Sequence, residues 1–233
     1  MSKRILISFL GAGRPNDNRE YKKAFYSIGN KEYESSFVAS VISNHFDVSN
    51  QIIIGTAKSM WEELYRYYSQ KNNIEINEDY YLNLSSLIDN SNHLTDIDKY
   101  DVDFSLIENA IGGNSKCLVL PYGLDYDEQI DIFRRISNTF DEVIGNNDEL
   151  ILDITHSFRS LPLFSTSVIN YLNDVKDKNA KINKVLYGML ESMSEFNNVA
   201  PIIDITSTIE LINGVKQHTH LKNMERAIYY LNC

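Results

Sequence analysis

The chain has 233 residues, of which 43% are hydrophobic and 23% are charged, so it can bury a core as an ordinary globular protein. Its formal net charge of −10 argues against a broad surface for duplex DNA or long RNA, which requires a basic face, but not against a small anionic ligand. No apolar run reaches the length of a membrane span, no signal-peptide pattern is present and cysteine is scarce, so we expect a cytoplasmic protein that does not bind membranes.

Taken in chain order, apolar runs alternate with segments of helical periodicity. Strands are expected at 5–10, 51–54, 117–120, 149–152 and 184–187, with a short strand at 21–28 before a turn at Gly29 and a further strand or linker from Ile202. Helices are expected over 37–46, 60–68, 102–111, 126–140, 161–175 and 211–231, whereas the polar stretch 72–100 is left as an insertion. The alternation predicts a Rossmann-like α/β fold, with a mainly parallel central sheet and helices on both faces.

Glycines and polar residues follow each of the five main expected strands. In chain order they are Gly11, Ala12, Gly13 and Arg14; Gly55 and Thr56; Tyr122 and Gly123; the turn from Asp153 to Arg159; and Gly188. Because the carboxyl ends of parallel strands meet at one edge, where open α/β folds bind ligands, we expect these residues to surround a ligand cleft. Glycine at such positions lets a ligand approach the backbone closely.

The turn after the fourth expected strand carries the densest chemistry. It combines the Asp153 carboxylate, the hydroxyls of Thr155 and Ser157, the His156 imidazole and the Arg159 guanidinium, and a helix follows it. The N–H groups at the start of that helix favour an anion, and the arginine fork suits two phosphate oxygens.

Each residue of this turn also has a structural interpretation. Asp153 can tie the turn together by accepting backbone N–H groups, and Thr155 and Ser157 can cap the next helix. Phe158 can belong to the core, and Arg159 can pair with a nearby carboxylate. The sequence leaves both sets of roles open.

Several common functional motifs are missing. Gly11-Ala12-Gly13 begins like a dinucleotide fingerprint, but Asn16 occupies the third glycine position and the second strand is not followed by an acidic residue. A phosphate-binding Gly-Lys-Ser/Thr loop and a Gly-x-Ser-x-Gly nucleophile elbow are also absent. His218 and His220 have no cysteine pair or acidic ligand nearby in the sequence, so we expect no metal and no cofactor.

Two motifs together resemble the CRISPR-associated Rossmann-fold (CARF) sensors of type III immunity. One is Asp153-Ile154-Thr155-His156 followed by the stretch 158–162, Phe-Arg-Ser-Leu-Pro, which is typical of the Asp-x-Thr-His branch. The other is the opening strand with Gly11-Ala12-Gly13, and Tyr187-Gly188 is also similar. The resemblance covers residues 3 to about 204. The sequence departs from that of many relatives at Ser157, where they have glycine.

The resemblance implies a CARF-type homodimer whose shared cleft binds cyclic oligoadenylate, a ring of 3′–5′-linked AMP units such as the tetra- or hexa-adenylate. The expected ligand contacts are Ser8, Gly11, Ala12, Gly13, Arg14, Gly55, Thr56, Tyr122, Gly123, Asp153, Thr155, His156, Ser157, Phe158, Arg159 and Gly188. Residues 1–205 are expected to form the ligand-sensing domain, and 206–233 a helical linker to an effector that is absent or removed. No arginine is followed by histidine at the spacing of a HEPN ribonuclease.

Three functions stay open at this point. The chain is a sensor that controls an effector, or a ring nuclease in which a ribose 2′-OH attacks the neighbouring phosphorus without a metal, or an α/β enzyme that acts on another phosphorylated metabolite. For the nuclease, His156 is the candidate proton carrier and Ser8 the candidate residue that orients the phosphate. The size of the ring, and whether residues 73–100 cover the cleft, also stay open.

Overall fold

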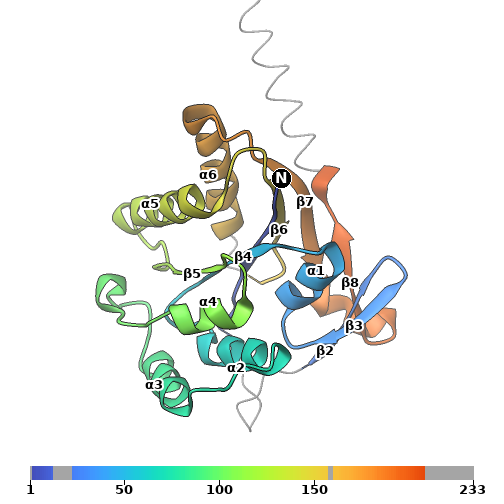
Figure 1. Cartoon of the computed structure of the whole chain (residues 1–233), viewed down its shortest axis with the longest axis horizontal. Helices are drawn as coiled ribbons and strands as arrows, with labels where there is room; N and C mark the ends of the chain where they lie inside the picture. The colour runs from blue at the N-terminus through green and yellow to red at the C-terminus, as the bar shows by residue number, and fades with distance from the viewer. Residues whose placement is uncertain (1, 13–22, 157–159, 208–233) are drawn as a thin grey trace, which may run out of the picture.

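The computed structural model describes residues 2–12, 23–156 and 160–207 of the chain. Within them, one eight-stranded sheet has the order β3-β2-β8-β7-β6-β1-β4-β5 (Figure 1). The strands β1 (Arg4–Phe9), β4 (Asn50–Gly55), β5 (Lys116–Val119), β6 (Glu149–Asp153) and β7 (Lys181–Gly188) run parallel to one another. These are the five predicted main strands, and their carboxyl ends share one edge, so the α/β fold class predicted from the sequence is confirmed.

The remaining three strands lie at one side of the sheet, where β8 and β2 run opposite to the five main strands and β3 runs in the same direction as them. β8 (Val199–Asp204) pairs antiparallel with β7, and β2 (Ala24–Ile28) pairs parallel with β8. β3 (Lys31–Ser35), which the apolar pattern did not predict, forms a hairpin with β2 around Gly29, whose φ of 58° lies in the left-handed region. The sequence of β3, Lys-Glu-Tyr-Glu-Ser, is rich in charged residues, which is why the apolar pattern did not predict a strand here. The same charges protect this outer edge of the sheet from pairing with another chain.

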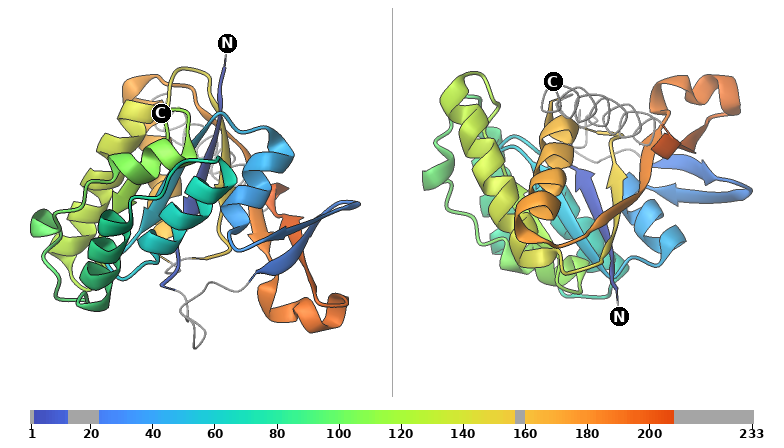
Figure 2. Two further views of the ribbon diagram at one scale, coloured as in Figure 1. Left: turned by 60° about the horizontal axis from the view of Figure 1, so that its bottom comes forward. Right: turned by 90° about the horizontal axis from the view of Figure 1, so that it is seen from above.

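Helices cover both faces of the sheet (Figure 2). The helices α1 (Val38–Phe46), α2 (Trp61–Lys71), α3 (Glu78–Asp89) and α4 (Ser105–Ile111) belong to one core, and α5 (Tyr126–Val143) and α6 (Leu161–Lys176) to the other. The strands alternate between these cores: Leu6 and Ile53 face the first, whereas their neighbours Ile5 and Ile52 face the second. No helix in the described ranges is both long enough and apolar enough to cross a bilayer.

The stretch 72–100 is more ordered than its polar composition suggested. It contains α3 and the short 3-10 helix η1 (Ile97–Lys99), and a second 3-10 helix, η2 (Leu190–Phe196), precedes β8. Asn77 caps α3 by accepting a hydrogen bond from the N–H of Tyr80, and Leu84 and Ile88 bury one face of the helix. The asparagine cap and the apolar pair four residues apart could have revealed this helix.

The connections place a crevice beside β1. After β1 and the β2–β3 hairpin, the chain forms β4 and β5 on one side of β1, and it then returns through α5 to β6 on the other side. This reversal of strand order separates the loops that follow β1, β4 and β6. In open α/β sheets, ligands bind at the carboxyl ends of the strands at such a switch point.

Glu62, in the first turn of α2, makes the free energy of unfolding depend on pH. One of its carboxylate oxygens is buried and has no hydrogen-bond partner among the described residues. Burial raises the pKa of Glu62 from its ordinary 4.5 to about 7, and the nearby carboxylates of Glu63 and Asp89 raise it as well. The folded state therefore binds the proton more tightly than the unfolded state, and the free energy of unfolding falls as the pH rises from about 4.5 to 7.

Replacing Glu62 with glutamine removes this charge. We expect Glu62→Gln to raise the free energy of unfolding by about 1 to 2 kcal/mol at pH 8, and to change it little near pH 4, where the carboxyl is already protonated. Urea unfolding at both pH values measures the difference. Glu78→Gln, at an exposed position in the first turn of α3, is the matched control. An equal effect of Glu62→Gln at both pH values would contradict the prediction.

Candidate functional site

A cavity of about 340 Å³ lies where the loops after β1, β4, β5 and β6 meet. Its walls are Phe9, Leu10, Gly11, Ala12, Ile54, Gly55, Thr56, Ser59, Tyr122, Thr155, His156 and Leu161. The structure thus brings together the predicted contacts Gly11, Ala12, Gly55, Thr56, Tyr122, Thr155 and His156, which are spread over the first 156 residues of the chain. The remaining predicted residues that the structure describes lie around this cavity without lining it.

Asp153 and Ser8 form a buried support beneath the cavity. They are paired in register on β6 and β1, and their exposed fractions are 0% and 2%. The Ser8 hydroxyl donates to Oδ2 of Asp153 at 2.6 Å, and the N–H of Thr155 donates to Oδ1 at 3.0 Å. The Asp153 carboxylate therefore holds the turn that follows it, as the structural interpretation of this residue anticipated.

His156 is half-buried at the cavity wall and interacts electrostatically with Asp153. Burial raises the pKa of the Asp153 carboxyl, although the hydrogen bonds from Ser8 and Thr155 oppose this change. Burial lowers the pKa of His156, and the charges of Asp153 and Glu191 oppose it. With its pKa below the ordinary value, His156 is a neutral imidazole at neutral pH, and one ring nitrogen can accept a proton or a hydrogen bond.

Gly188 supports the turn from the neighbouring strand. Its N–H donates to the Thr155 hydroxyl at 2.8 Å, and the N–H of Ile154 donates to the carbonyl of Leu186. A Cβ atom at residue 188 would lie 3.1 Å from both Oγ1 and Cγ2 of Thr155. Glycine at this position therefore allows close packing of β7 against the turn, and a larger residue would require the Thr155 side chain to shift.

The loop between β4 and α2 is tied to the loop after β1 by Ser59, a residue that the sequence analysis missed. The Ser59 hydroxyl accepts from the N–H of Thr56 at 2.9 Å and donates to the carbonyl of Leu10 at 2.7 Å. A Cβ atom at Gly55 would lie 2.7 Å from Oγ of Ser59 and 2.7 Å from the Trp61 ring. Gly55 thus allows close packing within the protein, and a serine just before a predicted helix was the available signal for Ser59.

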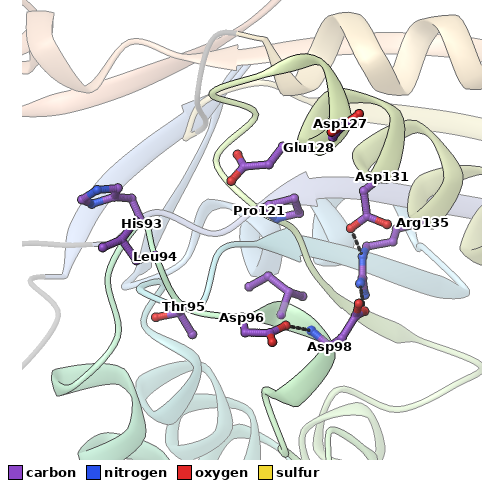
Figure 3. Close-up of a pocket in the computed structure, with 11 residues that line it drawn as sticks. His93, Leu94, Thr95, Asp96, Asp98, Pro121, Asp127, Glu128, Asp131 and Arg135 are labelled. Carbon is purple, nitrogen blue, oxygen red and sulfur yellow. Dashed lines mark hydrogen bonds and ion pairs between the residues drawn. The ribbon is translucent and has the colours of Figure 1, made fainter.

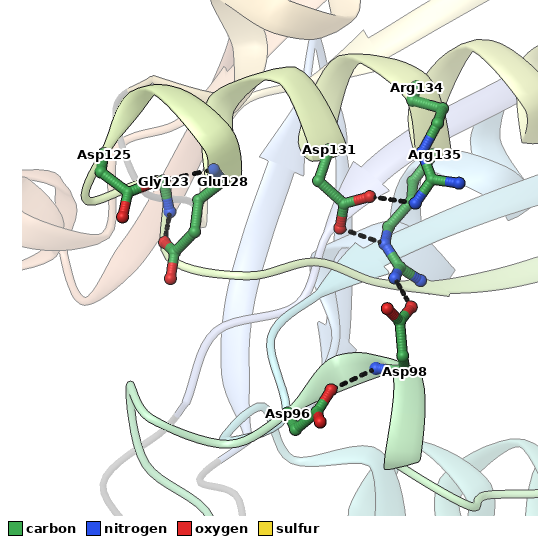
Figure 4. A network of polar contacts seen from close by, with 8 residues as sticks. All are labelled: Asp96, Asp98, Gly123, Asp125, Glu128, Asp131, Arg134 and Arg135. Carbon is green, nitrogen blue, oxygen red and sulfur yellow. Dashed lines mark hydrogen bonds and ion pairs between the residues drawn. The ribbon is translucent and has the colours of Figure 1, made fainter.

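Tyr122 lines the cavity, whereas Gly123 precedes α5 and interacts with its first turn. Gly123 has a φ of 78°, and its N–H donates to the carboxylate of Glu128 at 2.7 Å. Asp125 in turn accepts from the N–H of Glu128, so the two acidic side chains cap the helix together (Figure 4). The Tyr122 ring is contacted edge-on by His93, with 6.5 Å between the ring centroids.

A second pocket of about 410 Å³ lies beyond His93 and is strongly acidic (Figure 3). It is lined by His93, Leu94, Thr95, Asp96, Ile97, Asp98, Pro121, Asp127, Glu128, Asp131 and Arg135. Arg135 is held by Asp98 and, at 2.6 Å, by Asp131 (Figure 4). Because carboxylates repel phosphate, an anionic ligand is expected on the opposite side of Tyr122, in the cavity lined by Thr155 and His156.

Some of the predicted residues lie outside the described part of the chain. These are Gly13, Arg14, Ser157, Phe158 and Arg159, together with the predicted helix 211–231 that contains His218 and His220. Their proposed roles stay predictions. Among the residues that are described, no cluster of three or more histidine, cysteine, aspartate or glutamate side chains is arranged to hold a metal ion.

Comparison with known proteins identifies the family. A family model described as CRISPR system endoribonuclease Csx1, CARF domain, matches residues 5–189. The chain belongs to this CARF family. The resemblance drawn from the two motifs, to CARF proteins of type III CRISPR systems, is confirmed, and placement in the Asp-x-Thr-His branch stays a prediction.

Two longer proteins are similar to the chain. CRISPR-associated protein MJ1674 of Methanocaldococcus jannaschii is 36% identical over 94% of the chain, which spans 37% of that protein. The solved structure of Enterococcus italicus Csm6 bound to cyclic hexa-2′-fluoro-hexa-dAMP is 15% identical with a TM-score of 0.38, and the match covers 97% of the chain and 48% of Csm6. The chain thus spans less than half the length of each.

Proposed function

We propose that this CARF chain binds cyclic oligoadenylate in the 340 Å³ cavity and acts as the sensor of a type III CRISPR signalling protein. The observation that supports this most directly is that four strand-end loops converge on one cavity of a CARF domain, with Thr155 and His156 on its wall. The proposed ligand contacts are the residues predicted at these loops. Ser8, Asp153 and Gly188 act by positioning the turn rather than by touching the ring.

The charge distribution around the cavity favours a phosphate-containing ligand. Leu161, the first residue of α6, lines the cavity, so the positive end of a 16-residue helix lies beside it. The side chain of Ser160 makes no capping hydrogen bond there. The phosphates of the ring are therefore expected near the start of α6, because the acidic pocket beyond Tyr122 would repel them.

The size of the cavity and its surroundings support a homodimer. At about 340 Å³ the cavity is near the lower limit of ordinary ligand pockets, so one copy is suited to hold only part of a cyclic tetra- or hexa-adenylate. Tyr126, Ile130 and Leu163, at the beginnings of α5 and α6, are 74%, 51% and 70% exposed. A second copy related by a dyad would cover such apolar residues and hold the other half of a symmetric ring.

Titration calorimetry of the purified chain with cyclic tetra- and hexa-adenylate tests the proposal. We expect heat of binding with one of the two rings at a stoichiometry of one ring per two chains, and light scattering is expected to give the mass of a dimer. Linear oligoadenylates of the same length and a panel of other nucleotides are the controls. The absence of heat and of any thermal shift with both rings would refute sensing of this ligand. Binding of another phosphorylated compound alone would favour an enzyme of a different class.

The position of His156 favours ring cleavage as a second function of the same cavity. In this step the 2′-oxygen of one ribose forms a bond to the adjacent phosphorus while the bond from phosphorus to the 5′-oxygen breaks. The proton of the 2′-OH passes to the neutral His156, and the 5′-oxygen takes up a proton from water, which leaves a 2′,3′-cyclic phosphate and a 5′-OH. The protonated His156 then returns its proton to the solvent.

Cleavage by the wild-type chain is expected to persist in EDTA and to fall about a hundredfold or more in His156→Ala. Chromatography of the ring after incubation measures this rate. His45→Ala is the control and should cleave at the wild-type rate, because His45 lies near the end of α1, bonds to the Tyr33 hydroxyl of β3 and does not line the cavity. An intact ring after hours with the wild type would leave only the sensor function, and equal rates for His156→Ala and the wild type would refute the role of this residue.

A further inference from the structure

Two side chains connect the α3–η1 insertion, residues 77–104, to the cavity loop between β4 and α2. Lys58, in the middle of this loop, is not among the residues that line the cavity, and its Nζ donates to the carbonyls of Ile88 at 2.9 Å and Asp89 at 3.1 Å. The Tyr100 hydroxyl donates to the carbonyl of Ala57 at 3.0 Å. Three hydrogen bonds thus join the insertion to one loop.

The contact of Lys58 is suited to the end of a helix. Ile88 and Asp89 are the last residues of α3, where backbone carbonyls lack partners inside the helix and carry partial negative charge. α3 has no basic residue in its own last turn, so Lys58 supplies the cation from a loop 30 residues earlier in the chain. This ammonium group is engaged with the helix and does not line the cavity.

The same insertion also reaches the loop after β5. His93 contacts the ring of Tyr122. Asp98 on η1 pairs with Arg135 of α5 (Figures 3 and 4). The insertion therefore touches both the loop after β4 and the loop after β5. Each of these loops contributes a wall of the cavity, through Thr56 and Ser59 in one and Tyr122 in the other.

We propose that the α3–η1 insertion is a brace for the ligand cavity and that Lys58 is a positioning residue, which holds the loop 56–60 in its binding conformation through the end of α3. The inference rests on the proposed binding of cyclic oligoadenylate to this cavity. It differs from the role that a lysine at a strand end would otherwise be assigned, a direct phosphate contact.

Lys58→Met tests the brace. We expect this change to weaken ring binding about tenfold, with the same dependence of affinity on salt as in the wild type, because no phosphate contact is lost. Lys58→Arg should restore most of the affinity, since the guanidinium can donate to the same carbonyls. Tyr100→Phe, which removes one hydroxyl that bonds the same loop, should weaken binding in the same direction. Lys99→Met is the matched control, because Lys99 lies on η1 with its side chain 84% exposed.

Hydrogen exchange without ligand separates failure of the brace from failure of the proposed function. In Lys58→Met we expect faster exchange at residues 56–60 and at the end of α3, under conditions where the chain is fully folded. Unchanged exchange there, or wild-type affinity in Lys58→Met, would overturn the brace. A smaller salt dependence in Lys58→Met together with wild-type binding by Tyr100→Phe would instead identify a direct phosphate contact. If the wild type binds no ring, the proposed function fails, and the exchange rates still test whether Lys58 holds the loop.

Discussion

Asp153→Ala is expected to abolish ring binding and to lower the free energy of unfolding by about 2 to 3 kcal/mol. The side chain has an exposed fraction of 0% and accepts hydrogen bonds from the Ser8 hydroxyl and the Thr155 N–H. Alanine would leave both donors without this acceptor in a buried region, and the turn that carries Thr155 and His156 would lose its attachment to β1. Urea unfolding and calorimetric titration with the ring measure the two effects.

Asp153→Asn is the matched control for this change. The asparagine oxygen can still accept from the N–H of Thr155, and its amide group can donate to the Ser8 hydroxyl, which rotates to accept. Most of the unfolding free energy and of the ring affinity should therefore remain. If Asp153→Ala unfolded at the same urea concentration as the wild type and bound the ring equally well, the carboxylate would have no part in holding the turn.

Gly55→Ala is expected to lower the free energy of unfolding by about 1 to 3 kcal/mol, the usual cost of overpacking, and to weaken ring binding as well. The new Cβ would lie 2.7 Å from both the Ser59 hydroxyl and the Trp61 ring. Trp61 cannot move away easily, because it has an exposed fraction of 0% and its Nε1 donates to the carbonyl of Thr56 at 2.8 Å. The strain is therefore transferred to Ser59, which connects two walls of the cavity.

A double-mutant cycle with Trp61→Phe checks that packing is the cause. Phenylalanine removes part of the ring that the new Cβ would meet, so the double variant should lose less unfolding free energy than the sum of the two single changes. Strict additivity would contradict the packing explanation. If Gly55→Ala weakened ring binding but left the unfolding free energy unchanged, the glycine would serve only the close approach of a ligand.

The local sequence pattern was sufficient to predict the parallel strands of the sheet and most of its helices. Apolar runs and helical periodicity predicted the five parallel strands and the helices between them, because burial on both sides of a parallel sheet leaves a continuous apolar signal. β3 and α3 escaped prediction for the opposite reason. β3 is a charged edge strand, and α3 buries only Leu84 and Ile88, so neither leaves a strong signal in composition.

The sequence by itself determined the fold class, the family and which loops would meet at one edge of the sheet, because the alternation of strands and helices, the two family motifs and the strand-end glycines are all local features. Only the tertiary structure decided the role of each residue at that edge. Ser8 supports Asp153 from 145 positions away, Gly55 makes room for Trp61, and Lys58 bonds to the end of α3. Such partners are set by strand register and by the packing of distant segments, which residue types along a single chain do not specify.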